Sequence, residues 1–198
     1  GLSKLGLGYE DIKQEFPTLV YCSVTGFGQT GPYASRAGYD FLAQGLGGIM
    51  SITGDPDGEP MKVGVGIADV MTGMYAATAI LAALRHKDAT GEGQHIDTCL
   101  LDTQVSWLIN EGTNYLVSGK IPKKLGNEHP NIVPYKVFAT SDGHVILAVG
   151  NDRQFQDWCK AAGAHDLKNN PLYATNPLRI ENRETLYQAM PSFMENKT

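Results

Sequence analysis

The longest apolar stretch of the chain is KVGVGIADVMTGMYAATAILAALRHK, residues 62–87, and its one acid is Asp69. Small and apolar residues follow this acid, which predicts a long helix from about Asp69 to His86. The glycine-rich segment before it, MKVGVGI, has the composition of a strand. Threonine and glycine interrupt the apolar run before it reaches the ~20 residues of a membrane span, so we expect a buried helix and no membrane partner.

A strand is also expected at residues 18–25, TLVYCSVT, a segment rich in β-branched and aromatic residues and bounded by Pro17 and Gly26. Its continuous apolar character predicts a strand that is covered on both faces. A short acidic surface helix, GYEDIKQEF, precedes it, and a short strand, HIDTC, follows the long helix. Strands that alternate with helices make α/β the expected fold class.

Two further helices are expected in this part of the chain, over residues 39–52 despite three glycines and over residues 100–117. From Ser118 the sequence becomes polar, lysine-bearing and proline-interrupted, as in a linker. Beyond it, YKVFAT and HVILAVG flank SDG, which predicts a hairpin, followed by helices near 152–162 and 181–195. We therefore expect residues 1–118 to be part of a large domain, 119–132 a linker and 133–198 part of a small domain.

The charge pattern and the cysteines limit the kinds of partner. The formal net charge is -5 and there is no basic stripe, which argues against nucleic acid as a partner. Cys22, Cys99 and Cys159 lie far apart, without metal-knuckle spacing or the even count of a disulfide scaffold, so a reduced, cytoplasmic protein is expected. The histidine spacings match no compact ligand set, and we expect no metal.

Residues 26–31, GFGQTG, satisfy the GxGxxG pattern of dinucleotide-binding folds and follow a predicted strand. Pro32 comes directly after the pattern, and no acid lies about 20 residues further on to bind a ribose. We interpret the pattern as a tight glycine loop that lets the backbone pass close to a ligand or another segment.

The position of Asp69 allows two readings. Aspartate is a good N-cap, because its carboxylate accepts hydrogen bonds from the free N–H groups of a helix's first turn. In the second reading, small neighbours such as Gly73 and Ala76 let the acid face a crevice at the end of a strand, where α/β sheets bind ligands.

Three ordered motifs bear on this choice: VTGFGQTGPYASRAGYDFLAQGLGGIMSITG, GIADVMTGMYAATAILAAL and TGEGQHIDTCLLD. Together they resemble the class III CoA-transferases of the formyl-CoA and carnitine-CoA transferase type. The resemblance implies a Rossmann-like large domain, present here in part, and the start of a smaller α+β domain. Members of the family are considerably longer, so we expect these residues to be a piece of a longer chain that interlocks with a second copy in a homodimer.

In that family the acid at the position of Asp69 is the nucleophile. The resemblance implies a mixed anhydride with the donor acyl group, then an aspartyl-CoA thioester, then transfer of CoA to a small carboxylic acid acceptor. A carboxylate suits this chemistry because it is ionised at neutral pH and forms a reactive anhydride. We expect the helix N-terminus and nearby N–H groups to stabilise charge on the attacked carbonyl. No tightly bound cofactor is implied, and the coenzyme A thioester is a substrate.

RAGYDFLAQ contains a second group of site candidates. Taken alone, Tyr39 and Asp40 look like an aromatic anchor and an N-cap. By resemblance to the family, Tyr39 lines the CoA cleft and Asp40 is a catalytic or supporting partner of the nucleophile. Arg36 and Lys4 are the basic candidates for the CoA phosphates, with solvated surface charge as the other reading.

The same resemblance assigns Gly26, Gly28 and Gly31 to a loop beside the CoA cleft. The α-methylacyl-CoA racemases share the fold family but have a histidine where this chain has Tyr39. Histidine exchanges protons near neutral pH and a phenol does not, which favours CoA transfer over racemisation. Asp40 could replace that histidine, so a racemase and a noncatalytic fragment stay as alternatives. In a eukaryote the location would be cytoplasmic, mitochondrial or peroxisomal.

Overall fold

The computed structural model describes residues 1–197, which divide into two compact units. The first unit consists of Gly1–Thr53 and Asp57–Lys124. The second consists of Gly54–Pro56 and the chain from Leu125 onward. The main change from one unit to the other therefore falls inside residues 119–132, the segment with linker composition. That the units are parts of a large and a small domain stays a prediction.

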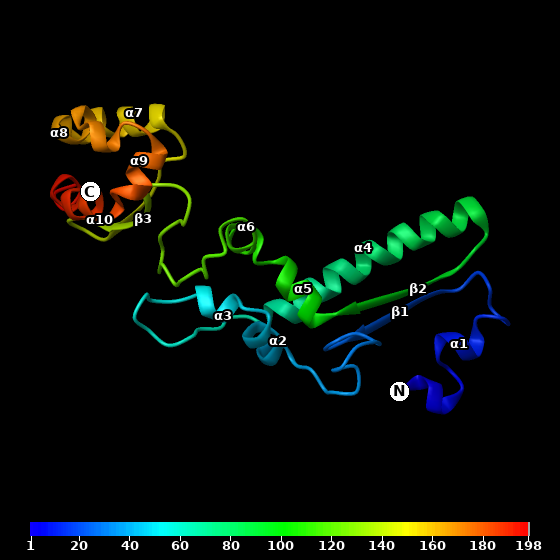
Figure 1. Ribbon diagram of the computed structural model, residues 1–198. Coiled ribbons are helices and arrows are strands. Elements are labelled where there is room, and N and C mark those ends of the chain that lie inside the picture. The colour runs from blue at the N-terminus through cyan, green and yellow to red at the C-terminus, as the bar shows by residue number, and fades with distance from the viewer. Residues whose placement is uncertain (198) are drawn as a thin grey trace. The chain divides into compact units, whose positions relative to one another are not determined.

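A parallel pair of strands forms the centre of the first unit (Figure 1). β1 (Val20–Thr25) pairs in register with β2 (Gln94–Cys99). α4 (Ile67–Thr90) lies between the two strands in the sequence and packs against both. A helical connection between parallel strands is typical of α/β folds, so the predicted fold class is confirmed. The Rossmann-like architecture stays a prediction.

Short helices make up the rest of the first unit: η1 (Leu2–Leu5), α1 (Tyr9–Ile12), α2 (Asp40–Leu46), α3 (Ile49–Ile52), α5 (Leu100–Ser106) and α6 (Ile109–Ser118). The single helix expected over residues 39–52 is wrong, because Gly48 adopts a left-handed φ of 90° between α2 and α3. The helix expected over residues 100–117 is also divided, since Trp107 and Leu108 form a turn between α5 and α6.

Two expectations for the long apolar stretch are wrong: the strand at its start and the burial of the helix that follows. Residues 61–66 form no strand, and the Val63 N–H donates to a side chain rather than to a neighbouring strand. α4 begins and ends slightly outside its predicted limits and buries one row of small residues, Ala68, Thr72, Ala76 and Ala83. Val70, Met74 and Leu81 are more than half exposed. α4 is long and apolar enough to cross a membrane. The core helices of soluble proteins can meet the same two criteria of length and composition.

β1 is also less buried than expected of a strand that is covered on both faces. Val24 is 52% exposed and the other residues of β1 are half-buried. Within residues 1–197 this sheet has two strands, so each strand has one edge without a strand partner.

An antiparallel hairpin begins the second unit. β3 (Tyr135–Ala139) pairs with β4 (His144–Ala148), which confirms the predicted hairpin. Helices follow: α7 (Asp152–Ala162), α8 (His165–Asn169), η2 (Pro171–Tyr173), α9 (Asn176–Glu181), α10 (Arg183–Ala189) and η3 (Pro191–Phe193). The helix predicted near 152–162 is confirmed. The single helix predicted near 181–195 is wrong, because Pro191 cannot continue α10 and begins η3.

Apolar side chains of the hairpin, of the helices and of residues next to them form the core of the second unit: Val133, Phe138, Val149, Phe155, Cys159, Leu186 and Met190. Arg179 is buried with them, with an exposed fraction of 0%. Its guanidinium donates to the carbonyls of Val133 and Tyr173 at 2.6 and 3.0 Å, and to the Asp152 carboxylate at 2.9 Å. These bonds replace water around a charge that would otherwise be costly to bury.

Candidate active site

Asp69 lies in the first turn of α4, close to the carboxyl end of β2. The preceding residue, Ala68, packs against Ala43 of α2 and against Leu100, which directly follows β2. Asp69 is exposed, and no described residue donates a hydrogen bond to its carboxylate or forms an ion pair with it. The carboxylate is therefore open to a ligand at the end of the sheet where α/β folds bind ligands.

Asp69 is not the N-cap of α4, which corrects the first reading of its position. The helix begins at Ile67, and Gly66 occupies the N-cap position without a side chain to offer. Asp40 caps the helix instead: its Oδ1 accepts from the Ala68 N–H at 2.7 Å and from the Asp69 N–H at 3.3 Å. A carboxylate from α2 thus satisfies two of the free donors of α4 and complements its dipole.

This cap also corrects the expected source of N–H groups for an attacked carbonyl. The N–H groups of Ala68 and Asp69 already serve Asp40, and those of Ile67 and Val70 donate to backbone carbonyls. The start of α4 therefore has no unused donor from Ile67 to Val70. It does not supply the N–H groups that were expected to stabilise charge on an attacked carbonyl.

Asp40 is held by a side chain that sequence reasoning missed. Asp40 is the first residue of α2 and Tyr39 is its N-cap, so the expectation that Asp40 caps its own helix is wrong. The Asp40 Oδ2 accepts from Gln44 Nε2 at 2.7 Å, and Gln44 Oε1 accepts from the Val63 N–H at 2.8 Å. A polar residue four positions after Asp40 in a predicted helix is the signal that could have identified Gln44.

Replacing Asp40 with alanine is expected to loosen the start of α4. The Ala68 and Asp69 N–H groups lose their acceptor, which should cost about 1–2 kcal/mol of unfolding free energy. Hydrogen–deuterium exchange read by mass spectrometry should become faster at the start of α4 and stay unchanged in the second unit. Asp40→Asn is the matched variant: it keeps an oxygen for the helix but sets its amide against that of Gln44, so a smaller loss is expected. Unchanged exchange in Asp40→Ala would contradict the capping role.

The other predicted site residues form no described hydrogen bond or ion pair with the Asp69 side chain. Tyr39 is 76% exposed. Arg36 stacks on the Tyr33 ring, with 4.6 Å between the guanidinium carbon and the ring centre, and Lys4 lies on η1. A role for these three residues in binding CoA stays a prediction.

The glycine loop after β1 is closed by a contact between its ends. A Cβ on Gly26 would lie 2.4 Å from the Cα of Gly38, so no larger residue fits there. Gly28 and Gly31 have φ values of 87° and 85°, in the left-handed region that favours glycine. This geometry agrees with a tight loop in which two backbone segments touch. Its place beside a CoA cleft stays a prediction.

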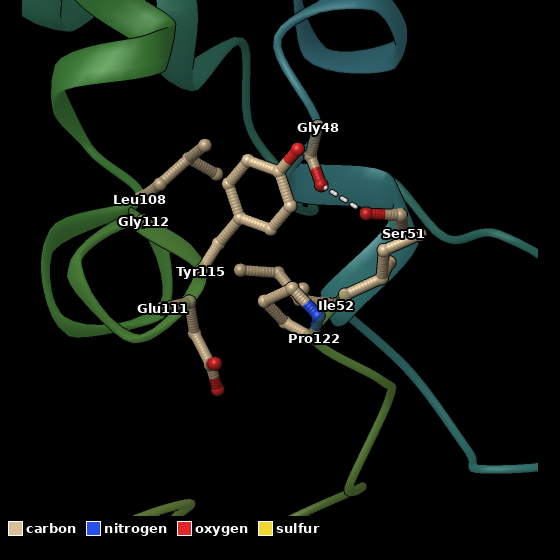
Figure 2. A pocket seen from close by; sticks show the side chains of 9 residues that line it. Gly48, Ser51, Ile52, Leu108, Glu111, Gly112, Tyr115 and Pro122 are labelled. Carbon is tan, nitrogen blue, oxygen red and sulfur yellow. Dashed lines mark hydrogen bonds between the residues drawn. The ribbon is translucent and has the colours of Figure 1, made fainter. Parts of the chain in front are cut away.

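Two cavities of the first unit are lined by other residues than Asp69. One, of about 260 Å³, lies between α3 and α6, and Figure 2 shows the Tyr115 ring among its walls near Ile52. The other, of about 620 Å³, is lined in part by Ser23 and His95, whose side chains are hydrogen-bonded at 3.0 Å.

The cysteines are weaker nucleophile candidates than the exposed carboxylate. Burial raises the pKa of the Cys159 thiol to about 11. Burial also raises the pKa values of Cys22 and Cys99. Because the thiolate is the reactive form of cysteine, these side chains are largely protonated and unreactive at neutral pH. Residues 1–197 contain no cluster of three side chains that could hold a metal ion.

Comparison with known proteins gives a consistent set of relatives. The model of CoA-transferase family III matches residues 1–198. The chain is 54% identical, over 95% of its length, to the succinate–glutarate CoA-transferase of Agrobacterium fabrum, and 44% identical, over 99%, to the succinyl-CoA:glutarate CoA-transferase of Homo sapiens. It covers 47% and 45% of those two proteins, or about half their length. A crystal structure of a CaiB/BaiF family protein from Brucella suis matches the whole chain and 52% of its own, with a TM-score of 0.78 and 49% identity.

Proposed function

Because the chain belongs to CoA-transferase family III, we propose that the protein moves CoA from an acyl-CoA donor to a carboxylic acid acceptor, with Asp69 as the nucleophile. The open carboxylate of Asp69 carries the proposal. The side chain is exposed, while its backbone N–H is bound to Asp40 and belongs to the first turn of a long helix. A nucleophile with a fixed backbone and no hydrogen bond to break can attack without a prior rearrangement.

Each half-reaction has two steps, and in each step a carboxylate and a thiolate replace one another at a carbonyl carbon. An Asp69 oxygen attacks the acyl-CoA carbonyl, the C–S bond breaks, and a mixed anhydride and CoA thiolate result. The thiolate then attacks the aspartyl carbonyl of the anhydride and releases the donor acid, which leaves CoA bound to Asp69 as a thioester. The acceptor carboxylate attacks this thioester and runs the same two steps in reverse. The cycle consumes no oxidant, reductant or net proton.

Asp40 is proposed to act on Asp69 through the backbone. Both of its oxygens accept hydrogen bonds from the protein, so it contributes by holding the start of α4 rather than by attacking a substrate. Tyr39, Arg36 and Lys4 are proposed to bind CoA, beside the loop of Gly26, Gly28 and Gly31.

The acids exchanged are proposed to be small dicarboxylates. Succinate and glutarate appear in the names of the two relatives reported above. The complete protein is proposed to form an interlocked homodimer. It is also proposed to be cytoplasmic.

The full-length protein tests this function with succinyl-CoA and ¹³C-labelled glutarate. Labelled glutaryl-CoA should form, and rapid quenching followed by digestion should yield an Asp69 peptide that carries CoA. A racemase would instead introduce solvent deuterium at the substrate α-carbon without moving CoA between acids. A noncatalytic protein would do neither while remaining folded. Transfer with the adduct on another residue would overturn the role of Asp69.

A further inference from the structure

A buried glutamine connects two segments that hold the Asp69 backbone. Gln44 lies on α2, one turn after Asp40, and its exposed fraction is 0%. Its Nε2 donates to Asp40 Oδ2 at 2.7 Å and to the Val65 carbonyl at 3.4 Å. Its Oε1 accepts from the Val63 N–H at 2.8 Å. Both polar atoms of this amide are therefore in use, as expected of a polar group that is removed from water.

The partners of Gln44 allow its amide only one orientation. The Asp40 carboxylate is an acceptor and the Val63 N–H is a donor. If the amide oxygen and nitrogen changed places, oxygen would face oxygen at one end and N–H would face N–H at the other. The order of donors and acceptors is therefore fixed: the Val63 N–H donates to Gln44, Gln44 donates to Asp40, and Asp40 also accepts from the start of α4.

The segment that enters α4 depends on the same contacts. Residues 63–66 belong to no strand or helix. Val63 and Val65 are bound by Gln44, and the position of a Cβ on Gly66 would lie 3.6 Å from the carboxyl group of Asp40. The path of the backbone into the first turn of α4 is thus set by two side chains of α2.

We infer that Gln44 is a positioning residue for Asp69, an inference that rests on the proposed role of Asp69 as the nucleophile. Gln44 holds one oxygen of Asp40 so that the other binds the N–H groups of Ala68 and Asp69. It also binds Val63 and so fixes the segment that leads into the helix. Because both oxygens of Asp40 are committed, Asp69 is the carboxylate of the pair that is free to be acylated. Gln44 therefore determines where the nucleophile lies and which of two neighbouring acids reacts.

Gln44→Met in the full-length protein removes the amide and keeps a side chain of similar length. We expect kcat to fall about 10- to 100-fold while KM for the acyl-CoA stays within about threefold, since the nucleophile is misplaced and CoA binding is untouched. Trypsin separates the two acids, because cleavage after Arg36, Lys62 and Arg85 gives peptides 37–62 and 63–85. In the variant, CoA should appear on the peptide of Asp40 as well as on that of Asp69.

Gln104→Met is the matched control for a buried glutamine. Gln104 is 2% exposed, but its Nε2 has no hydrogen-bond partner in the part of the chain that is described. The kcat of Gln104→Met should stay within about threefold of the wild-type value, and CoA should appear on Asp69 alone. Equal losses in the two methionine variants would mean that packing, not hydrogen bonding, explains the effect, and would overturn the inference.

Exchanging the carboxylate of position 40 and the amide of position 44 tests the order of donors and acceptors. Asp40→Asn alone sets two amide groups against each other, and Gln44→Glu alone sets two carboxylates together, so each should lower kcat by about 10- to 100-fold. In the double variant the new amide donates to the new carboxylate, the carboxylate still accepts from Val63, and the helix keeps its oxygen acceptor. Its kcat should return to within about tenfold of the wild-type value. A double variant no faster than either single variant would overturn the inference.

The wild-type protein separates this inference from the proposed function. If it neither transfers CoA nor forms the Asp69 adduct, the proposed function fails and the inference falls with it. If it does both, and Gln44→Met matches it in kcat and in adduct position, only the inference fails. Should the variants not fold, hydrogen exchange of the wild type decides: the amides of Val63 and Ala68 must be protected, and free exchange at both would overturn the inference.

Discussion

Asp69→Asn should lower kcat for CoA transfer by at least about a thousandfold, because a neutral amide cannot attack a thioester or carry an acyl group. The variant should fold normally, since the side chain is exposed and no described residue binds its carboxylate. The loss of a negative charge from the first turn of α4 should cost less than about 1 kcal/mol of unfolding free energy. Steady-state kinetics measures the loss of kcat. Mass spectrometry of the quenched protein should show that the CoA adduct has disappeared, and urea unfolding measures the change in unfolding free energy.

Asp102→Asn provides the matched control for a first-turn acid. Asp102 is the third residue of α5, as Asp69 is the third residue of α4, and both are exposed. Its kcat should stay within about threefold of the wild-type value. In Asp69→Asn, deamidation of the asparagine would restore the aspartate and the activity. Asp69→Ala has no amide and excludes this recovery. Transfer at the wild-type rate by Asp69→Ala would exclude Asp69 as the nucleophile.

Arg179→Met should give the largest loss of stability, about 3–4 kcal/mol in the unfolding free energy of the second unit. The variant leaves the buried carbonyls of Val133 and Tyr173 without their donors and removes the group that packs 4.6 Å from the Phe155 ring centre. The ion pair with Asp152 contributes little to this figure, because that carboxylate is 52% exposed and its charge is screened by water. The cost therefore comes mainly from the carbonyls and the packing.

Urea unfolding followed by tryptophan fluorescence measures this loss. The chain has two tryptophans, Trp107 in the first unit and Trp158 beside the core of the second. In a background in which Trp107 and any tryptophan outside residues 1–198 are replaced by phenylalanine, Trp158 reports the second unit alone. Arg153→Ala is the control, since that side chain is 92% exposed and its ion pair with Asp157 should be worth less than about 0.5 kcal/mol. A midpoint for Arg179→Met equal to that of the control would show that the buried contacts do not stabilise this unit.

Elements with strong local signals were predicted well. α7 is one example, because the side chain of Asn151 accepts from the Gln154 N–H at its start and Gly163 ends it in the left-handed conformation. The hairpin of β3 and β4 is another, since its turn residues and flanking apolar runs act over a few positions. Capping and turn formation involve neighbours in the sequence, so a pattern of residues is enough to predict them.

Elements that depend on distant partners were predicted poorly. Residues 61–66 have strand composition, but no strand within residues 1–197 pairs with them, and Gln44 binds the backbone of Val63 and Val65 instead. The helix expected over residues 39–52 divides at Gly48. Gly47, at the end of α2, packs so closely on α5 that a Cβ there would lie 2.4 Å from Gln104. In these places tertiary packing overrides local preference, because it satisfies or excludes atoms that no local pattern can foresee.

The sequence by itself determined the α/β class, the hairpin and, through the motif around GIADVMTG, the single acid at the start of the long helix. It did not determine how that helix begins. The structure brings the Asp40 carboxylate to the N–H groups of Ala68 and Asp69, the first of them 28 positions further along the chain, and places Gln44 behind it. The reason is physical: a side chain can cap its own helix through a local pattern, but a cap from another helix exists only after the two have packed together.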